Sequence, residues 1–122
     1  MRINAGMIQQ IDWTDHRGTK QYGTIQEKLI KKHSVYPDEV EDAFLFGSNP
    51  VGYQKIGPVD DPKIDGIRGL FFGKVEHARY LIMIAIVKLD GQAIVLSARE
   101  MTSKQSSFYQ REVSRQSKRR LL

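Results

Sequence analysis

IRGLFFGKVEHARYLIMIAIVKLDGQAIVLSAR, residues 67–99, decides the fold of this chain. It contains three segments, 67–75, 79–89 and 93–99, that are rich in β-branched, aromatic and aliphatic residues, as strands are. The dipeptide Asp90-Gly91 between the last two segments is a strong hairpin signal. We therefore predict an antiparallel β-meander.

Two helices are predicted before this meander. Thr24 suits the N-cap of the first, and Glu27 follows at the spacing of a capping box. The apolar residues of this segment share one face, and they are Ile25, Leu29 and Ile30. This first helix should end near His33, where the pattern stops.

The second helix is predicted to begin at Pro37, because proline suits a first helical turn. Asp38 and Glu39 suit the positive N-terminal end of the helix dipole. One apolar face follows, formed by Val40, Ala43 and Phe44. Gly47 is placed to close the helix.

Weaker signals flank these helices. Residues 7–13 alternate imperfectly between apolar and polar side chains and predict a short first strand. Residues 48–66 hold three prolines and three glycines, so we expect a long, mobile connection with at most one edge strand at 51–56.

A third helix should follow the meander. Thr102 and Gln105 form another capping-box pattern, and a partial apolar face is formed by Phe108, Tyr109 and Val113. The prediction is an α+β fold with two N-terminal helices, a meander of three to four strands and a C-terminal helix. At 122 residues the chain has room for one domain, residues 1–122, because domains commonly have about 100 to 150 residues.

The composition excludes several classes of site. The chain has no cysteine, so disulfides, thiolate nucleophiles and cysteine-bound metals are absent, and it has three histidines. We expect neither a metal site nor a cofactor. The longest apolar run, 80–87, is much shorter than the roughly 20 residues that cross a bilayer, and the N-terminus lacks a signal pattern. We therefore expect a cytoplasmic protein with no membrane partner.

The charge lies mainly at the C-terminus. The chain has 19 Lys and Arg against 14 Asp and Glu, a net charge of +5. Residues 111–122 hold five cations and only Glu112 as an anion, which accounts for +4 of that charge. These cations are Arg111, Arg115, Lys118, Arg119 and Arg120. This basic tail is either a solvated helix end, which adds little to stability without a partner, or a surface for a polyanion.

Further cations lie near the ends of predicted elements. Lys31, Lys32 and His33 lie at a helix C-terminus, where they would favourably meet the dipole. Arg68 and Arg99 lie on the outer strands, where arginines are commonly solvated or paired with carboxylates such as Asp65 and Glu100. Each position therefore has a structural explanation beside a functional one.

The order of several short motifs resembles the BrnT family. The motifs are Ile11-Asp12-Trp13-Thr14-Asp15, Lys32-His33-Ser34-Val35, the segment Asp38–Phe44, Arg68 five residues before Gly73, and Leu96-Ser97-Ala98-Arg99 leading to Thr102 and Tyr109. They extend over residues 11 to about 112. The Lys-His and Ser-Ala-Arg motifs are the most specific.

This resemblance implies a RelE-like fold and the role of a toxin in a bacterial type II toxin-antitoxin pair. BrnT toxins are ribonucleases that stop translation. The implied partners are a cognate antitoxin, RNA as substrate, and operator DNA through the toxin-antitoxin complex.

The chain departs from the family pattern at several positions. Trp13 lies twenty residues before His33, which indicates an insertion, and Ser34 replaces a glycine. Glu100 stands where a second basic residue is usual, and Gln105 with Ser106 replaces a glutamate-arginine pair. Two cations are thereby lost from the expected RNA face.

Metal-free RNA cleavage needs a base, cations for the phosphoryl oxygens and an acid for the leaving oxygen. His33 is the natural titrating group, and Arg68 and Arg99 are the natural phosphate ligands. The expected RNA-binding residues are Lys32, Tyr109, Arg111 and Arg115. Tyr109 together with Phe108 could instead be core, and His33 could be purely structural.

Three functions therefore remain open from the sequence. The first is an endoribonuclease toxin, which the retained arginines favour. The second is a binding module that keeps the fold without the chemistry, which the lost cations favour. The third is a nucleic-acid-binding domain that uses the basic tail.

Overall fold

The computed structural model describes residues 2–3, 8–14, 19, 21–46, 50–54, 66–75 and 79–121. The elements in chain order are β1 (Arg2–Ile3), β2 (Gln10–Ile11), α1 (Ile25–His33), α2 (Pro37–Glu41), the π-helical turn η2 (Asp42–Phe46), β3 (Val51–Gln54), β4 (Gly66–Lys74), β5 (Tyr80–Lys88), β6 (Gln92–Glu100) and α3 (Ser103–Leu121). The predicted α+β class is confirmed.

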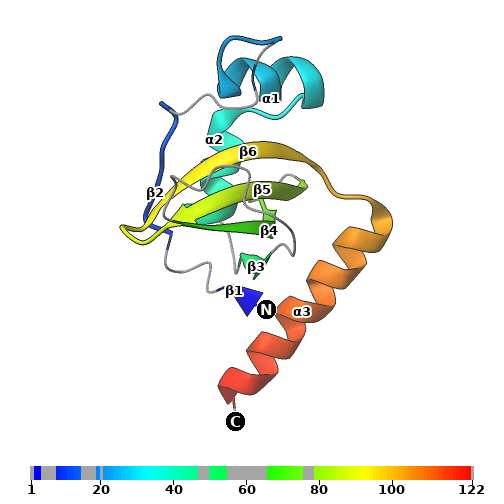
Figure 1. Ribbon diagram of the computed structural model, residues 1–122. Helices are drawn as coiled ribbons and strands as arrows, with labels where there is room; N and C mark the ends of the chain where they lie inside the picture. Colours follow the sequence, from blue (N-terminus) through cyan, green and yellow to red (C-terminus); the bar gives the residue numbers. More distant parts are fainter. Residues whose placement is uncertain are drawn as a thin grey trace.

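One six-stranded sheet has the order β1-β3-β4-β5-β6-β2 (Figure 1). The predicted meander is its centre: β4, β5 and β6 pair antiparallel in chain order. Gly91 has a φ of 87°, as the predicted turn before β6 requires of a residue without a β-carbon. β2 joins the outer edge of β6 in parallel over Gln10 and Ile11 alone.

The predicted meander of three to four strands is found as β3, β4, β5 and β6, which pair antiparallel in chain order. β3 lies within the predicted edge strand 51–56, and β2 lies within the predicted first strand 7–13. The sheet also holds a strand that was not predicted. β1 has two residues and was not predicted, because so short a strand has no periodicity to detect. It exists because Arg2 and Ile3 pair with the edge of β3.

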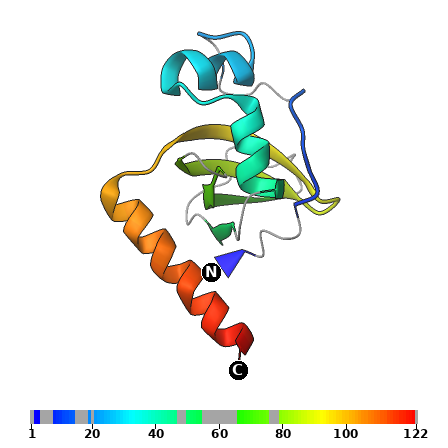
Figure 2. The same cartoon turned by 180° about the vertical axis from the view of Figure 1, so that it is seen from behind.

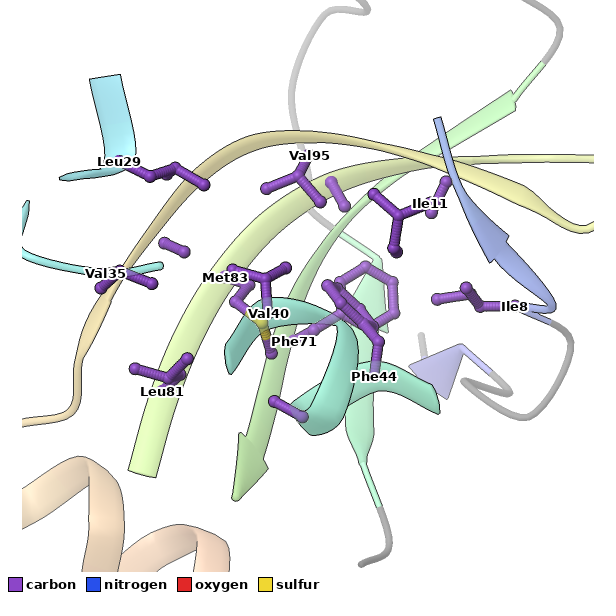
Figure 3. Close-up of a cluster of buried hydrophobic side chains, with 14 of the residues drawn as sticks. Ile8, Ile11, Leu29, Val35, Val40, Phe44, Phe71, Leu81, Met83 and Val95 are labelled. Atoms are coloured by element: carbon purple, nitrogen blue, oxygen red, sulfur yellow. The ribbon is translucent and has the colours of Figure 1, made fainter. Parts of the chain in front are cut away.

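The main core lies on the face of the sheet that carries α1, α2 and η2 (Figure 3). In register, Phe71 of β4, Met83 of β5 and Ala98 of β6 lie side by side on this face. Leu29 of α1 and Val40 of α2 are fully buried against them. The apolar faces predicted for the two helices bury at Ile25, Leu29, Val40, Ala43 and Phe44. The prediction is wrong for Ile30, which is 38% exposed because it lies at the margin of the buried face of α1.

A second apolar cluster lies on the opposite face, under α3. Phe72 and Ile82 pair across β4 and β5, and Tyr109 of α3 is buried with them. Phe108 lies with its ring centroid 5.3 Å from that of Phe72. Figures 1 and 2 show α3 leaving the end of β6 and running away from α1. The apolar face predicted from Phe108, Tyr109 and Val113 is confirmed.

The predicted helix starts are confirmed by their caps. The Thr24 hydroxyl accepts a hydrogen bond from the Glu27 amide at 3.1 Å, and α1 begins at the next residue. At the start of α3, the Gln105 amide donates to the Thr102 hydroxyl at 3.3 Å, and the Thr102 amide donates back to Gln105 Oε1 at 2.9 Å. These reciprocal bonds are the capping box that the sequence indicated.

The second predicted helix begins at Pro37 but changes geometry after Glu41. Its second half, η2, is a π-helical turn, which the apolar periodicity of the sequence does not reveal. This turn buries Ala43 and Phe44 in the main core. Gly47, the expected end of the helix, lies outside the described residues.

Two further expectations concern the connection 48–66 and the tail. Residues 55–65 of the connection lie outside the described residues. α3 continues to Leu121 in one uninterrupted helix, so most of the basic tail belongs to a regular element. Within the described parts of the chain, no helix combines the length and apolar character that a bilayer span requires.

Gly73 is required by close packing between β4 and η2. A β-carbon at this position would lie 2.7 Å from the Ala43 carbonyl oxygen. This oxygen belongs to the backbone, so it cannot move away by a side-chain rotation. Gly73→Ala is therefore expected to lower the free energy of unfolding by about 1 to 3 kcal/mol. Urea denaturation of the variant and of the wild-type protein measures this loss. An unchanged midpoint in the variant would show that η2 can shift without cost.

Candidate functional site

The outer edge of β6 is open where α1 approaches it. β2 pairs with Gln92 and Ala93 only, and from Ile94 onward this edge has no strand partner among the residues that the structure describes. α1 lies along that edge, at the top in Figure 1. Lys28 of α1 donates from Nζ to the Leu96 carbonyl oxygen at 3.1 Å, so a helix side chain satisfies an acceptor of the sheet edge.

A β-bulge shapes this edge. Ile84 of β5 pairs with Ser97, but Ala85 pairs with Val95, so Leu96 is the extra residue of β6. The bulge allows both Val95 and Ala98 to enter the main core, although they are three residues apart. Arg99 consequently projects from the opposite face, near the end of the strand.

His33 is the last residue of α1, and the next residue reverses the chain. Ser34 has φ 54° and ψ 38°, the left-handed conformation of a helix C-cap. Its amide donates to the Ile30 carbonyl oxygen at 3.1 Å, and the Val35 amide donates to that of Leu29 at 3.0 Å. The first bond is that of the αL C-cap motif, and the second holds the following residue to the same helix end, which gives the half-buried His33 a defined place at the end of α1.

Three cations act electrostatically on His33. Burial lowers the pKa of its imidazole below the ordinary value of 6.5, and the charges of Lys32, Lys28 and Arg99 lower it further. Lys28 and Lys32 lie one helical turn apart on α1, whereas Arg99 comes from β6. We call Lys28, Lys32, His33 and Arg99 the β6 edge cluster. At neutral pH it presents an uncharged imidazole among three positive charges.

The Arg99 side chain is exposed at the end of β6. Its Nη1 donates to the Glu100 carbonyl oxygen and to Gln105 Oε1, each at 3.4 Å. The predicted alternative, pairing with the Glu100 carboxylate, is therefore not the observed contact. Gln105 also caps α3, so the start of that helix holds Arg99 by a hydrogen bond.

Arg68 does not join this cluster. It pairs with Ile86 of β5, whereas Arg99 pairs with Ile82. The two arginines share a face of the sheet but lie apart by about 13 Å along the strands and about 10 Å across them. A single phosphate clamp made of both side chains, as the sequence suggested, is therefore not the arrangement found.

The predicted RNA-binding residues of α3 lie elsewhere. The ring of Tyr109 is buried and contacts Tyr80 edge-on at 5.8 Å, so it is not available to stack on a base. The prediction of Tyr109 as an RNA ligand is thus corrected in favour of core packing. Arg111 and Arg115 are exposed, and Arg115 forms an ion pair with Glu112 at 2.9 Å. Arg115 lies about 18 Å along the helix from Ser103. Figure 1 shows α3 running away from α1.

Sequence reasoning missed Lys28 and Arg79. The spacing of Lys28 and Lys32, four residues apart on a predicted helix, could have indicated that both face the same way. Arg79 contacts Glu39, forty residues earlier in the chain, and no local signal links two such positions. Lys31, which the sequence grouped with Lys32, instead faces Glu27 at 3.8 Å.

Within the described ranges, no three His, Asp or Glu side chains are grouped so that they could hold a metal ion. The chain was compared with protein-family models, with curated proteins and with solved structures, and no match was found in any of the three comparisons.

The lowered pKa of His33 can be tested by NMR titration. By NMR its imidazole should titrate with a midpoint below 6.5, because burial and three cations disfavour the charged form. Lys32→Gln and Arg99→Gln should each raise that midpoint, whereas Arg111→Gln on α3 should leave it unchanged. Since the folded pKa is the lower one, stability should fall as the pH drops from 6.5 toward the folded value. A midpoint at or above 6.5 in the wild-type protein would contradict this account.

Proposed function

We propose that this protein is an endoribonuclease that cleaves RNA at the β6 edge cluster. The observation that carries the proposal is the placement of His33, with a lowered pKa, beside Lys28, Lys32 and Arg99. A neutral imidazole can accept a proton at pH 7, and the surrounding cations attract a phosphodiester. The resemblance to BrnT toxins, whose most specific motifs contain His33 and Arg99, points to the same two residues.

The proposed step uses the RNA itself as the nucleophile. The 2′-hydroxyl oxygen attacks the adjacent phosphorus while His33 takes its proton, and the bond from phosphorus to the 5′-oxygen breaks. The leaving 5′-oxygen takes a proton from water or from the imidazolium. The products are a 2′,3′-cyclic phosphate and a 5′-hydroxyl, so the reaction consumes no water and changes no oxidation state.

Arg99 is proposed to hold the phosphoryl oxygens in the transition state. Its guanidinium matches two oxygens of a phosphate, and its exposure at the strand end leaves its remaining donors accessible. Lys32 adds a point charge one residue from the base. Because Lys28 already binds the Leu96 carbonyl oxygen, we assign it to setting the local potential.

The biological role follows from the resemblance. We propose a toxin of a type II toxin-antitoxin pair, with a RelE-like fold, that inhibits translation and is neutralised by a cognate antitoxin. The antitoxin would also bring the complex to operator DNA. The α+β fold, with helices before an antiparallel meander, is compatible with this assignment.

RNA cleavage by the purified chain in EDTA tests the proposal. Because the proposed step uses only side-chain groups, cleavage should persist in EDTA and yield cyclic phosphate ends. Loss on chelation with recovery on adding a divalent ion would overturn the metal-independent mechanism. Induction in a bacterial host should stop growth, and co-expression of the neighbouring gene should restore it.

A binding module without catalysis is the second candidate. Glu100 is exposed beside Arg99, and Ser106 stands where the family has a cation. Both substitutions lower the positive charge around the phosphate site. RNA binding that weakens steeply with salt, without any cleavage of the bound RNA, would favour this candidate.

A further inference from the structure

The guanidinium group of Arg79, which lies just before β5, contacts three other parts of the molecule. Its Nε donates to Glu39 Oε2 at 3.0 Å, and its Nη2 donates to Glu39 Oε1 at 2.8 Å. Nη2 also donates to the Ser34 carbonyl oxygen, and Nη1 lies 3.7 Å from a carboxylate oxygen of Glu100. One side chain before β5 thus contacts the α1–α2 turn, the start of α2 and the end of β6.

Glu39 is itself held from two sides. Its Oε1 accepts the Tyr36 amide at 3.1 Å, which caps α2, and it also accepts from Arg79. The hydrogen bond from Arg79 is the largest cause of a lowered pKa for this carboxyl. Glu39 and Arg79 are both mostly buried, with side-chain exposures of 20% and 25%. A mostly buried pair joined by two hydrogen bonds holds its two side chains in a more defined relative position than an exposed ion pair does.

The contact with Ser34 bears directly on His33. Ser34 follows His33 and adopts the left-handed conformation, which is unfavourable for a residue other than glycine. Its carbonyl group accepts a hydrogen bond from Arg79, so the turn is held from outside α1 as well as by the bonds of Ser34 and Val35 to the end of α1. Beyond the turn, Val35 is fully buried and holds the chain on the core.

We propose that Arg79 is a positioning residue, which holds the α1–α2 turn and thereby fixes the place of His33 where the end of α1 packs against β6. Arg79 acts on the geometry of His33 through Ser34 and Glu39. The groups that face His33 are Lys28 and Lys32 from α1 and Arg99 from β6, and Arg79 is not among the charges that act on it directly. The catalytic part of this inference rests on the proposed function, whereas the positioning part does not.

NMR titration of His33 tests the positioning directly. Arg79→Lys keeps a cation beside Glu39 but loses the guanidinium that donates to both carboxylate oxygens. Glu39→Gln loses the negative charge of the acceptor. Both variants should loosen the turn, and the His33 midpoint should move up toward 6.5 as the imidazole leaves its cationic surroundings. Trp13→Phe is the matched control, because it removes one hydrogen bond to Glu41, at 2.8 Å, from the other end of α2.

The kinetic test uses the same three variants. Arg79→Lys and Glu39→Gln should lower kcat for RNA cleavage about 10-fold or more with little change in KM, because misplacement of a base costs rate. Trp13→Phe should keep kcat within about twofold. A folded Arg79→Lys protein whose His33 midpoint and kcat equal those of the wild type would overturn the inference.

The two proposals fail in different ways. If the wild-type chain does not cleave RNA, the proposed function is wrong, and the His33 titration still decides whether Arg79 positions that residue. If Arg79→Lys and Trp13→Phe move the His33 midpoint equally, Arg79 contributes only general stability and the positioning role is refuted.

Discussion

Arg99→Ala is expected to slow RNA cleavage about 100-fold or more, because loss of a group that stabilises transition-state charge commonly costs this much. The side chain is exposed, so its removal should leave the fold intact. The loss should appear in kcat and in kcat/KM together, since the cation is proposed to act on the charge that develops during the reaction. Steady-state kinetics on a short RNA, with circular dichroism as a check of folding, measures it.

The control is Arg111→Ala, an exposed arginine of α3 whose removal changes the net charge equally. It should reduce cleavage only slightly. Arg68→Ala addresses a separate question, because Arg68 lies two strands away from Arg99. A 100-fold loss in Arg68→Ala as well would show that RNA extends across the sheet face. Full activity in Arg99→Ala would place the chemistry outside the β6 edge cluster.

Phe71→Ala is expected to cost about 3 to 5 kcal/mol of unfolding free energy, the usual range for a buried phenylalanine. Phe71 is fully buried between β5 and η2, and its ring meets that of Phe44 edge-on at 5.2 Å (Figure 3). Small domains are stable by only about 5 to 15 kcal/mol, so this variant should be close to unfolding at 37 °C. Urea denaturation at 25 °C gives the midpoint.

Ile67→Ala is the matched control, because Ile67 is on the same strand but 40% exposed. It should cost about 1 kcal/mol or less. If Phe71→Ala does not fold, Phe71→Leu keeps part of the side chain and should show a smaller, measurable loss. Equal losses for Phe71→Leu and Ile67→Ala would contradict the central place given to Phe71 in the core.

Most of the fold could be predicted from local patterns. The segments 67–99 contain long apolar runs, and their hairpin turn has a specific dipeptide, so β5 and β6 are paired by neighbours in the chain. The helix starts at Thr24 and Thr102 depend on side chains three residues apart. Interactions at such short range are encoded within a few residues, which explains why these predictions were confirmed.

The site was less accessible to sequence reasoning. His33 and Lys32 were placed together because they are adjacent in the chain. Tyr109 was assigned to RNA because its residue type fits stacking, and only its position under the sheet shows that the ring is buried. Arg68 and Arg99 were grouped by chemistry, but strand register separates them.

The sequence by itself determined the α+β class, the helix caps and the apolar faces that form the core, because each depends on residues close together in the chain. Only the tertiary structure decided that the charge of Arg99 acts on His33. That arrangement depends on the bulge at Leu96, which sets the face of β6 that carries Arg99, and on the packing of α1 against β6. The physical reason is that bulges, strand register and helix packing are settled by contacts between residues far apart in sequence, and such contacts form only when the whole core is assembled.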